Sequence, residues 1–341
     1  NVQYRPGMET EFVTDLYDLI DTRGRWAQHM MQQEKPDVMM VHFLAMDIMK
    51  HALWRFMDQD HPRYEQGPFE NAIRDGYKRV DEYIGRLMAM LPADASTIVM
   101  SDHGFGPLQN MVNLNVFFMD KGLMKLKKNP WTQLKALAFR WGITPSAAYQ
   151  LIVKMGMQNL TARVSKQTRN GVIGRFLSFD SVDWDRTVAY SMGHVGQVYL
   201  NVAGRDPHGI VQPEDYEKTR QHVIDALGEL RDKNGRPILS RVIAGDEVYH
   251  GPYANKGPDL HLVLDDYNMI ACPLFATEGK IITSQIRGDS GCHRSEGIFL
   301  AQGPGIKAGV HLPEKQISDL APTIMHLLGE PVPKIMDGRV L

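Results

Sequence analysis

Aspartate and histidine side chains occur in three short clusters that could bind metal ions. The first contains Asp47 and His51, the second contains Asp102 beside His103, and the third is His293 in a glycine-rich loop. A spacing of four places Asp47 and His51 on one face of a helix. Carboxylates mixed with imidazoles suit zinc, manganese or iron better than calcium or magnesium. Taken singly, each cluster also has a structural explanation, such as a helix cap, a turn or an exposed loop histidine.

Each cluster is predicted to lie beside a buried strand. The apolar run 38–44 precedes Asp47, the run 97–101 leads directly into Asp102, and the run 297–301 follows His293. Open α/β sheets bind their ligands at the carboxyl ends of strands. The clusters offer two carboxylates and three imidazoles, close to what two metal ions require but not enough. Paired metal ions serve in-line displacement at phosphorus, so the residues favour a two-metal site of that kind.

Other residues are candidates for substrate contact. His194 is flanked by glycines and could approach a substrate, and Arg294 could contact a phosphate group. Lys50 and Arg55 are further candidates for phosphate contact, with structural roles as the alternative. The sequence contains no P-loop, no G-x-S-x-G elbow and no G-x-G-x-x-G motif after a strand.

The elements that must position these residues alternate between helix and strand. Helices are predicted at 10–34, from Asp47 to Phe56 and at 69–90, with the apolar strands between them. This order predicts an α/β fold with a mostly parallel central sheet and helices on both faces.

The alternation is lost in the middle of the chain, where a locally basic region and two helical segments, 131–141 and 146–157, are predicted. We therefore divide the chain into a first core part at 1–110, an inserted and mainly helical cap at 111–195, and a second core part at 196–341. Plain structural helices with solvated lysines are the alternative to a cap.

Composition limits the partners. The 341 residues carry a net charge of −2, which gives no overall electrostatic case for nucleic acid or an anionic membrane. No apolar stretch approaches the roughly 20 residues of a membrane span. Two cysteines indicate a reducing compartment, so we expect a cytoplasmic protein. Because the sequence begins with Asn1 rather than methionine, an export signal upstream stays open.

The combined motifs resemble a known family. Similar segments, in this order, are 36–55, 101–106, 189–201, 293–306 and 319–339. They resemble the type I phosphodiesterase and nucleotide pyrophosphatase branch of the alkaline phosphatase superfamily, near its predicted phosphohydrolases and phosphomutases. The resemblance implies an alkaline-phosphatase-like fold and two divalent metal ions, zinc or alternatively manganese.

The resemblance also implies a role for each cluster. Asp47, His51 and His293 match the ligands of one metal, and Asp102 and His103 match ligands of the other. The family's second metal also takes an N-terminal aspartate and the nucleophilic threonine or serine, which have no counterpart here. We expect this nucleophile upstream of residue 1, so this piece alone is expected to be inactive.

The implied reaction is attack of the metal-bound hydroxyl on a small phosphate ester, which forms a phospho-enzyme that water then hydrolyses. The expected partners are that substrate and either an upstream segment or another chain that supplies the nucleophile. A phosphomutase of the same superfamily and a non-catalytic binding or assembly piece remain as alternatives. The sequence does not indicate an oligomeric state.

Overall fold

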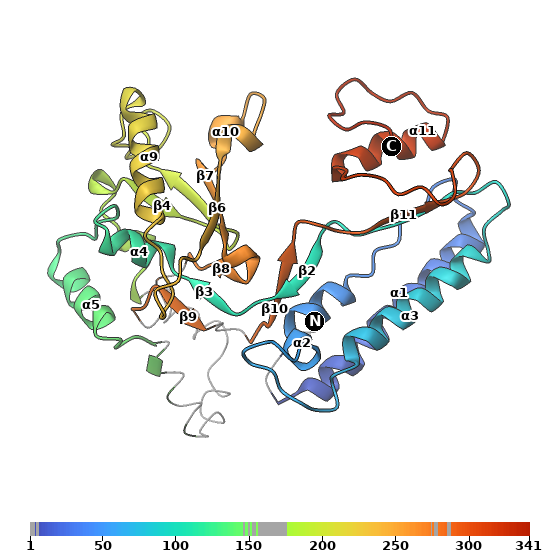
Figure 1. Ribbon diagram of the computed structural model, residues 1–341, viewed down its shortest axis with the longest axis horizontal. Coiled ribbons are helices and arrows are strands. Elements are labelled where there is room, and N and C mark those ends of the chain that lie inside the picture. The colour runs from blue at the N-terminus through green and yellow to red at the C-terminus, as the bar shows by residue number, and fades with distance from the viewer. Residues whose placement is uncertain are drawn as a thin grey trace. The chain divides into compact units, whose positions relative to one another are not determined.

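The chain forms two compact units. The computed structural model describes residues 4, 7–145, 147–148, 151, 155, 176–273, 275, 279–284 and 288–341. The first unit comprises Asn1–Pro107 and Gly288–Leu341, and the second comprises Leu108–Arg287. Figure 1 labels the elements of both units. The proposed cap at 111–195 stays a prediction, and the second unit begins near its start but continues beyond its end.

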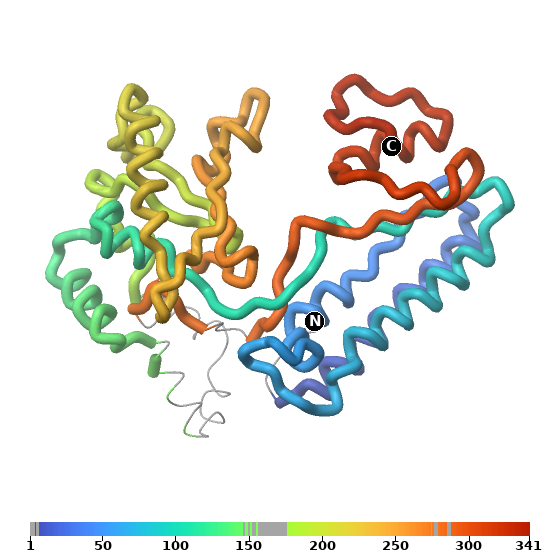
Figure 2. The backbone as a smooth tube through the Cα atoms, viewed as in Figure 1, coloured from blue at the N-terminus to red at the C-terminus, as the bar shows by residue number. Residues whose placement is uncertain are grey.

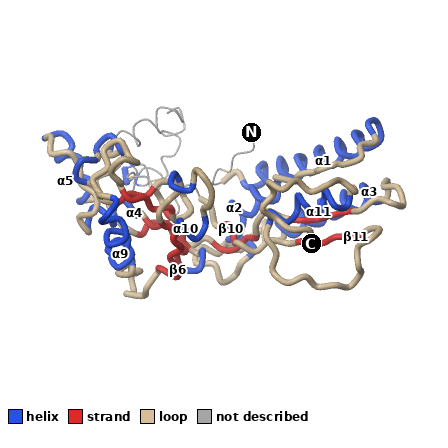
Figure 3. Tube along the Cα trace, turned by 90° about the horizontal axis from the view of Figure 1, so that it is seen from above, coloured by secondary structure: helices blue, strands red, loops and turns tan. Residues whose placement is uncertain are grey.

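Three helices build the core of the first unit. They are α1 (Glu9–Glu34), α2 (Ala45–Met57) and α3 (Ala72–Met88), which confirms the three helices predicted in this part of the chain. The long helices α1 and α3 run side by side (Figure 3). The buried apolar residues that join the three helices include Phe12, Leu16, Ile20, Met49, Leu53, Phe56, Ile73 and Tyr83. Burial of these faces stabilises the helices more than helix propensity does.

Two short sheets bring distant segments of the first unit together. Strand β1 (Thr97–Met100) pairs antiparallel with β11 (Phe299–Gln302), and β2 (Gly104–Pro107) pairs antiparallel with β10 (Gly291–Arg294). Figure 2 shows the backbones of these segments running alongside each other. A 3₁₀ turn, η6 (Ile317–Asp319), and helix α11 (Leu320–Leu327) follow. The pairing brings the second and third sequence clusters to neighbouring strands.

The second unit is built on a seven-stranded sheet of order β4-β5-β7-β8-β3-β9, with β6 paired to β7. The strands are β3 (Asn110–Val112), β4 (Ala189–Ser191), β5 (Gln197–Leu200), β6 (Leu239–Ala244), β7 (Leu260–Leu264), β8 (Met269–Ala271) and β9 (Ile282–Ser284). The helices are α4 (Leu114–Asp120), α5 (Pro130–Arg140), α9 (Tyr216–Leu227) and α10 (Gly245–Val248). The 3₁₀ turns are η1 (Phe179–Ser181), η2 (Trp184–Arg186), η3 (Pro213–Asp215), η4 (Ala254–Lys256) and η5 (Asp265–Tyr267). Apolar residues of α4 and α9 pack with the sheet in one core.

The helix predicted at 131–141 is confirmed by α5. The helix predicted at 146–157 falls largely outside the residues that the structure describes.

The α/β class is confirmed, but the expected strand directions are wrong. Among the named strands of the described ranges, β3 and β8 pair in parallel and every other pair is antiparallel. Parallel neighbours need a long crossover connection. The link from β4 to β5 has only residues 192–196, which is too short for a crossover. Local periodicity identifies strands but carries no information about which strands become neighbours.

The strand expected at 38–44 is also wrong. These residues lie outside the named strands, and their exposure alternates, with Val38, Met40, His42 and Leu44 exposed. Met40 is 88% exposed. An apolar run becomes a strand only where a neighbour supplies hydrogen-bond partners, and none of the described strands pairs with this run. The strand predicted at 97–101 is confirmed as β1, but its side chains are only half-buried.

Helices α1 and α3 pack tightly at Gly24. A Cβ atom there would lie 2.2 Å from the Tyr83 ring. We expect Gly24→Ala to lower the free energy of unfolding by about 1–3 kcal/mol through overpacking. The control is Gly85→Ala in α3, where a Cβ would meet no atom within 4 Å. That change should raise the free energy of unfolding by roughly 0.5–1 kcal/mol. Urea unfolding measures the change in unfolding free energy for both variants. Equal effects of the two substitutions would contradict the tight packing at Gly24.

Candidate metal centre

Helix α2 presents the first cluster. Its buried face carries Met46, Met49 and Leu53, which anchor it in the core. Asp47 and His51 lie one turn apart on a half-exposed face, with 3.7 Å between His51 Nε2 and Asp47 Oδ1. The apolar side of the helix therefore fixes the direction in which this pair points.

Strands β2 and β10 bring two more histidines to the same oxygen. The Nε2 atom of His293, on β10, lies 3.2 Å from Asp47 Oδ1 and 3.0 Å from His51 Nε2. The Nε2 atom of His103, just before β2, lies 3.7 Å from Asp47 Oδ1. The rings of His103 and His293 stack with their centroids 3.7 Å apart. Four of the five predicted metal ligands thus converge within the first unit.

Asp102 lies at the open side of this group. Its side chain is 69% exposed, and its Oδ2 atom lies 3.6 Å from His103 Nε2. The position beside His103 leaves the carboxylate accessible to a ligand from solvent. Asp102 therefore borders the cluster without being packed into it.

Backbone carbonyls set the protonation of two imidazoles. His51 Nδ1 lies 2.9 Å from the Gly291 carbonyl oxygen, and His103 Nδ1 lies 3.0 Å from the Gly104 carbonyl oxygen. A carbonyl only accepts hydrogen bonds, so each Nδ1 carries the proton. In the neutral rings, Nε2 then presents its lone pair toward Asp47. Metal-binding histidines are typically held in this way through the nitrogen that does not bind the metal.

Asp47 is the residue whose environment most clearly fits a cation. Its Oδ1 atom is buried and has no hydrogen-bond partner of suitable geometry among the described residues, although His293 Nε2 is 3.2 Å away. Burial acts to raise the pKa of Asp47, but the close contact with His293 and the positive charge that His51, His293 and His103 carry when protonated outweigh it and lower the pKa. A buried carboxylate oxygen without a partner is costly. A bound cation among the converging lone pairs would satisfy that oxygen, and the donor set suits zinc or manganese.

Phe105 forms an aromatic support for the histidines, a role that the sequence did not reveal. Its ring packs edge-on against His51 and His293, with centroids 4.8 and 5.4 Å apart. Trp54 stacks on it at 5.8 Å, and Lys50 Nζ lies 4.6 Å from its centroid. Phe105 is opposite His293 in the pairing of β2 with β10. The ring therefore restricts the orientation of two predicted ligands.

Ser290 joins the loop before His293 to helix α2, and sequence reasoning missed it too. The Ser290 amide donates to the His51 carbonyl at 2.6 Å. The hydroxyl donates to the Ala52 carbonyl at 3.0 Å and accepts from the Arg55 amide at 3.1 Å. The side chain is fully buried. Buried serines give no recognisable pattern in a sequence, because loops commonly contain exposed ones.

Gly291 allows this loop to approach α2 closely. A Cβ atom at Gly291 would lie 2.4 Å from the Lys50 carbonyl oxygen and 2.7 Å from the Phe105 ring. Any side chain here would push β10 away from the helix. The glycine therefore sets the spacing between His51 and His293.

The predicted substrate contacts are placed differently. The Arg294 guanidinium donates to the carbonyls of Pro107 at 2.8 Å and His293 at 3.0 Å. The Arg55 guanidinium donates to Tyr4 and contacts Glu65. These contacts give both arginines structural roles, and phosphate contact by Arg294 stays a prediction.

His194 is exposed and lies in the second unit, on the loop between β4 and β5. Its proposed contact with substrate also stays a prediction.

The cysteines lie outside the proposed ligand set. Cys272 is buried and Cys292 is half-buried. Burial raises the pKa of the Cys292 thiol, so the thiol stays protonated near neutral pH. A protonated thiol is a poor metal ligand.

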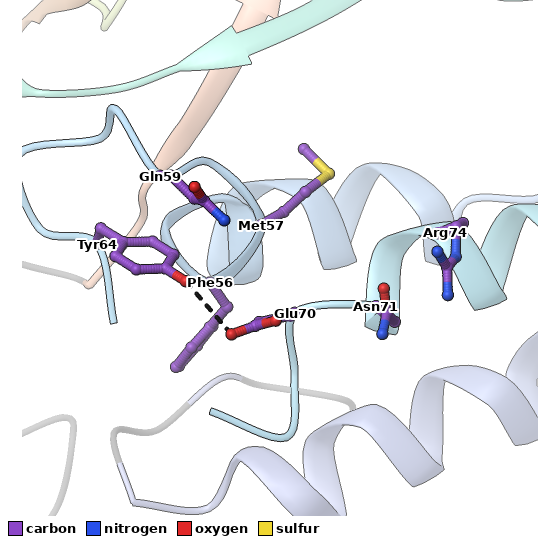
Figure 4. Close-up of a pocket in the computed structure, with 7 residues that line it drawn as sticks. All are labelled: Phe56, Met57, Gln59, Tyr64, Glu70, Asn71 and Arg74. Atoms are coloured by element: carbon purple, nitrogen blue, oxygen red, sulfur yellow. Dashed lines mark hydrogen bonds between the residues drawn. The ribbon is translucent and has the colours of Figure 1, made fainter. Parts of the chain in front are cut away.

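A pocket in the first unit lies between the end of α2 and the start of α3. It has a volume of about 440 Å³. Polar, charged and apolar side chains line it, namely Phe56, Met57, Gln59, Tyr64, Glu70, Asn71 and Arg74 (Figure 4). The Tyr64 hydroxyl donates to Glu70 at 3.3 Å across it. None of the five predicted metal ligands lines this pocket, so its geometry adds nothing to the metal site.

A carboxylate and several imidazoles that converge on one point are ligand types that divalent transition-metal ions prefer. The chain belongs to the type I phosphodiesterase / nucleotide pyrophosphatase family, whose model matches residues 3–272. This family lies in the alkaline phosphatase superfamily. Membership supports hydrolysis of phosphoric esters and the use of divalent metal ions. His293 lies beyond the matched residues, so its place in the site rests on the structure.

Comparison with the sequences of curated proteins gave no match. In the described part of the chain, no helix combines the length and apolar content that crossing a bilayer requires.

Loss of the Ser290 hydroxyl should weaken the attachment to α2 that holds His293 in position. We expect Ser290→Ala to lower the free energy of unfolding by about 1–3 kcal/mol, because buried backbone groups at Ala52 and Arg55 lose a partner. Zinc affinity should fall by roughly 10–100-fold, as for other residues that support metal ligands. Urea unfolding and competition with a chelator measure the two effects. The control is Ser295→Ala at an exposed position of the same segment, and equal affinity in both variants would contradict this role.

Metal binding should stabilise the folded chain. At a free zinc concentration of about 100 times Kd, the free energy of unfolding should rise by about 2.7 kcal/mol. His293→Ala should abolish the rise, because the variant loses one of the converging nitrogens. His311→Ala removes an exposed histidine of the same unit and should keep the rise. Thermal unfolding in the presence of zinc and of a chelator measures this stabilisation. If zinc still stabilised His293→Ala, His293 would be excluded as a metal ligand.

Proposed function

We propose that this chain is the metal-binding part of a phosphoric-ester hydrolase of the phosphodiesterase and nucleotide pyrophosphatase type. The observation that carries the proposal is Asp47 Oδ1, a buried oxygen that has three imidazole nitrogens within 3.7 Å but no hydrogen-bond partner of suitable geometry among the described residues. Family membership supplies the reaction class. The proposal gives a chemical reason for an arrangement that would otherwise cost stability.

The proposed ligand sets follow the clusters. Asp47, His51 and His293 would hold one divalent ion, zinc or alternatively manganese. Asp102 and His103 would contribute to a second site. The distances of 3.7 Å from His103 Nε2 to Asp47 and 3.6 Å to Asp102 support neighbouring sites that share this part of the chain.

The bound ions would polarise the phosphoryl group, activate the attacking hydroxyl and stabilise the leaving oxygen. The protein side chains then have a limited task, which is to present lone pairs in fixed positions. His51 and His103 carry their protons on Nδ1, toward backbone carbonyls, so neither proton is directed at a substrate. General acid–base chemistry by these imidazoles is therefore not part of the proposal.

The attacking hydroxyl is proposed to come from a threonine or serine outside this sequence. Ser101 is the hydroxyl nearest to the clusters in sequence, but its Oγ accepts from the Ile298 amide at 2.9 Å. This bond extends the pairing of β1 with β11, and Ser101 thus has a structural role. The segment or chain that supplies the nucleophile is the proposed partner.

The proposal is tested on the full-length protein. We expect it to contain zinc or manganese and to hydrolyse bis-p-nitrophenyl phosphate. Asp47→Asn should lower kcat/KM by roughly 100-fold or more, because it removes the charge of a proposed ligand. Asp94→Asn, at an exposed site in the same unit, is the control. Absence of bound metal together with absence of turnover would refute the assignment.

The same assay separates the alternatives. Transfer of the phosphoryl group to a second hydroxyl of the substrate rather than to water would indicate a phosphomutase. Metal binding without turnover of any phosphate ester by the full-length protein would indicate a binding or assembly role.

A further inference from the structure

Helix α5 carries an apolar face that stays exposed among the residues that the structure describes. Asn129 is the N-cap of the helix, and its side chain accepts a hydrogen bond from the Thr132 amide at 2.8 Å. Pro130 occupies the first helical position. Thr132 and Phe139 are its buried residues. One side of α5 is therefore anchored in the second unit (Figure 1).

The other side of α5 is apolar and exposed. Trp131, Leu134, Leu137 and Trp141 are 66%, 57%, 45% and 71% exposed. At 3.6 residues per turn, these positions fall within an arc of roughly 120°, opposite the buried side. A tryptophan stands near each end of the stripe. Large apolar side chains in one contiguous exposed stripe usually mark a site of interaction.

The chain segment that contains this face is basic, although Lys121 at its start forms an ion pair with Glu229. Between residues 121 and 145 lie six lysines and arginines and no aspartate or glutamate, namely Lys121, Lys125, Lys127, Lys128, Lys135 and Arg140. After Asp120, the next acidic residue in the sequence is Asp180. Lys127 and Lys128 are exposed at the start of α5, and Lys135 Nζ lies 5.5 Å from the Trp131 ring centroid. In a chain of net charge −2, this segment carries a local excess of positive charge.

We propose that the exposed face of α5, defined by Trp131, Leu134, Leu137 and Trp141, docks onto an anionic lipid bilayer surface. Tryptophans place their rings at the boundary between headgroups and acyl chains. Lysines beside an apolar helix face attract anionic headgroups. The near-neutral charge of the whole chain conceals this feature, because acidic residues elsewhere balance it.

A bilayer fits this face better than other anionic partners do. The phosphates of a nucleic acid would bind the lysines. Its phosphate backbone has no apolar surface that could bury the leucines of a convex helix face. An acidic protein groove would require a matching cavity. A lipid bilayer deforms around a protruding helix face. It supplies both an apolar acyl-chain region and negatively charged headgroups. The proposal does not depend on the metal site.

The test is binding of the full chain to vesicles of phosphatidylglycerol mixed with phosphatidylcholine, measured by co-sedimentation and tryptophan fluorescence. We expect binding to the mixed vesicles that weakens with salt, and little binding to phosphatidylcholine alone. Leu134→Gln/Leu137→Gln should weaken the partition at least about tenfold. Lys127→Gln/Lys128→Gln should weaken it by about tenfold or more.

Matched controls keep the outcome interpretable. Val195→Gln/Val248→Gln removes exposed apolar groups elsewhere in the second unit, and Lys218→Gln/Lys233→Gln removes the same charge at other exposed positions. Both controls should bind as the unchanged chain does. Absence of binding to anionic vesicles, equal losses in variants and controls, or tighter binding to an acidic peptide or an oligonucleotide would overturn the proposal. Urea unfolding of each variant distinguishes lost docking from lost folding.

Discussion

The candidate site depends on the attachment of the loop around Ser290 to helix α2. Three hydrogen bonds join Ser290 to backbone groups of residues 51, 52 and 55, and the absent side chain of Gly291 lets the contact form. His51 and His293 are 242 residues apart in the chain. Closing a loop of that length has an entropic cost that the local contacts must offset. Without this attachment, α2 and β10 would carry their ligands independently.

The electrostatics of the site follow from that constraint. Once β10 is held against α2, Asp47 becomes partly desolvated while imidazole nitrogens gather around it. The lowered pKa of Asp47 keeps its carboxylate charged in the pH range where proteins usually work. Among the described residues, Asp47 Oδ1 has no hydrogen-bond partner of suitable geometry, and a buried charged oxygen in that state is stabilised by a cation. This arrangement is what the proposed metal site would require.

The two units carry different kinds of chemistry. The first unit contains all five residues proposed as metal ligands, held by helices and by two short sheets. The second unit contains a hydrophobic core around its sheet and the helix α5, whose outer face is apolar and which lies in a lysine-rich segment. Hydrolysis and surface attachment would thus be separable by mutation, because the residues proposed for them share no element.

The sequence by itself determined the ligand types, the helices that carry or flank them and the family. Helical periodicity is a local property, so α1, α2, α3 and α5 were predictable from the spacing of apolar residues. The motif around Asp102 and the order of the clusters carried the family resemblance. What only the tertiary structure decided were the contacts between distant segments: the antiparallel directions, the unpaired run at 38–44, and the support from Phe105 and Ser290. These depend on which segments become neighbours in space, and neighbours far apart in sequence leave no periodic signal in a single chain.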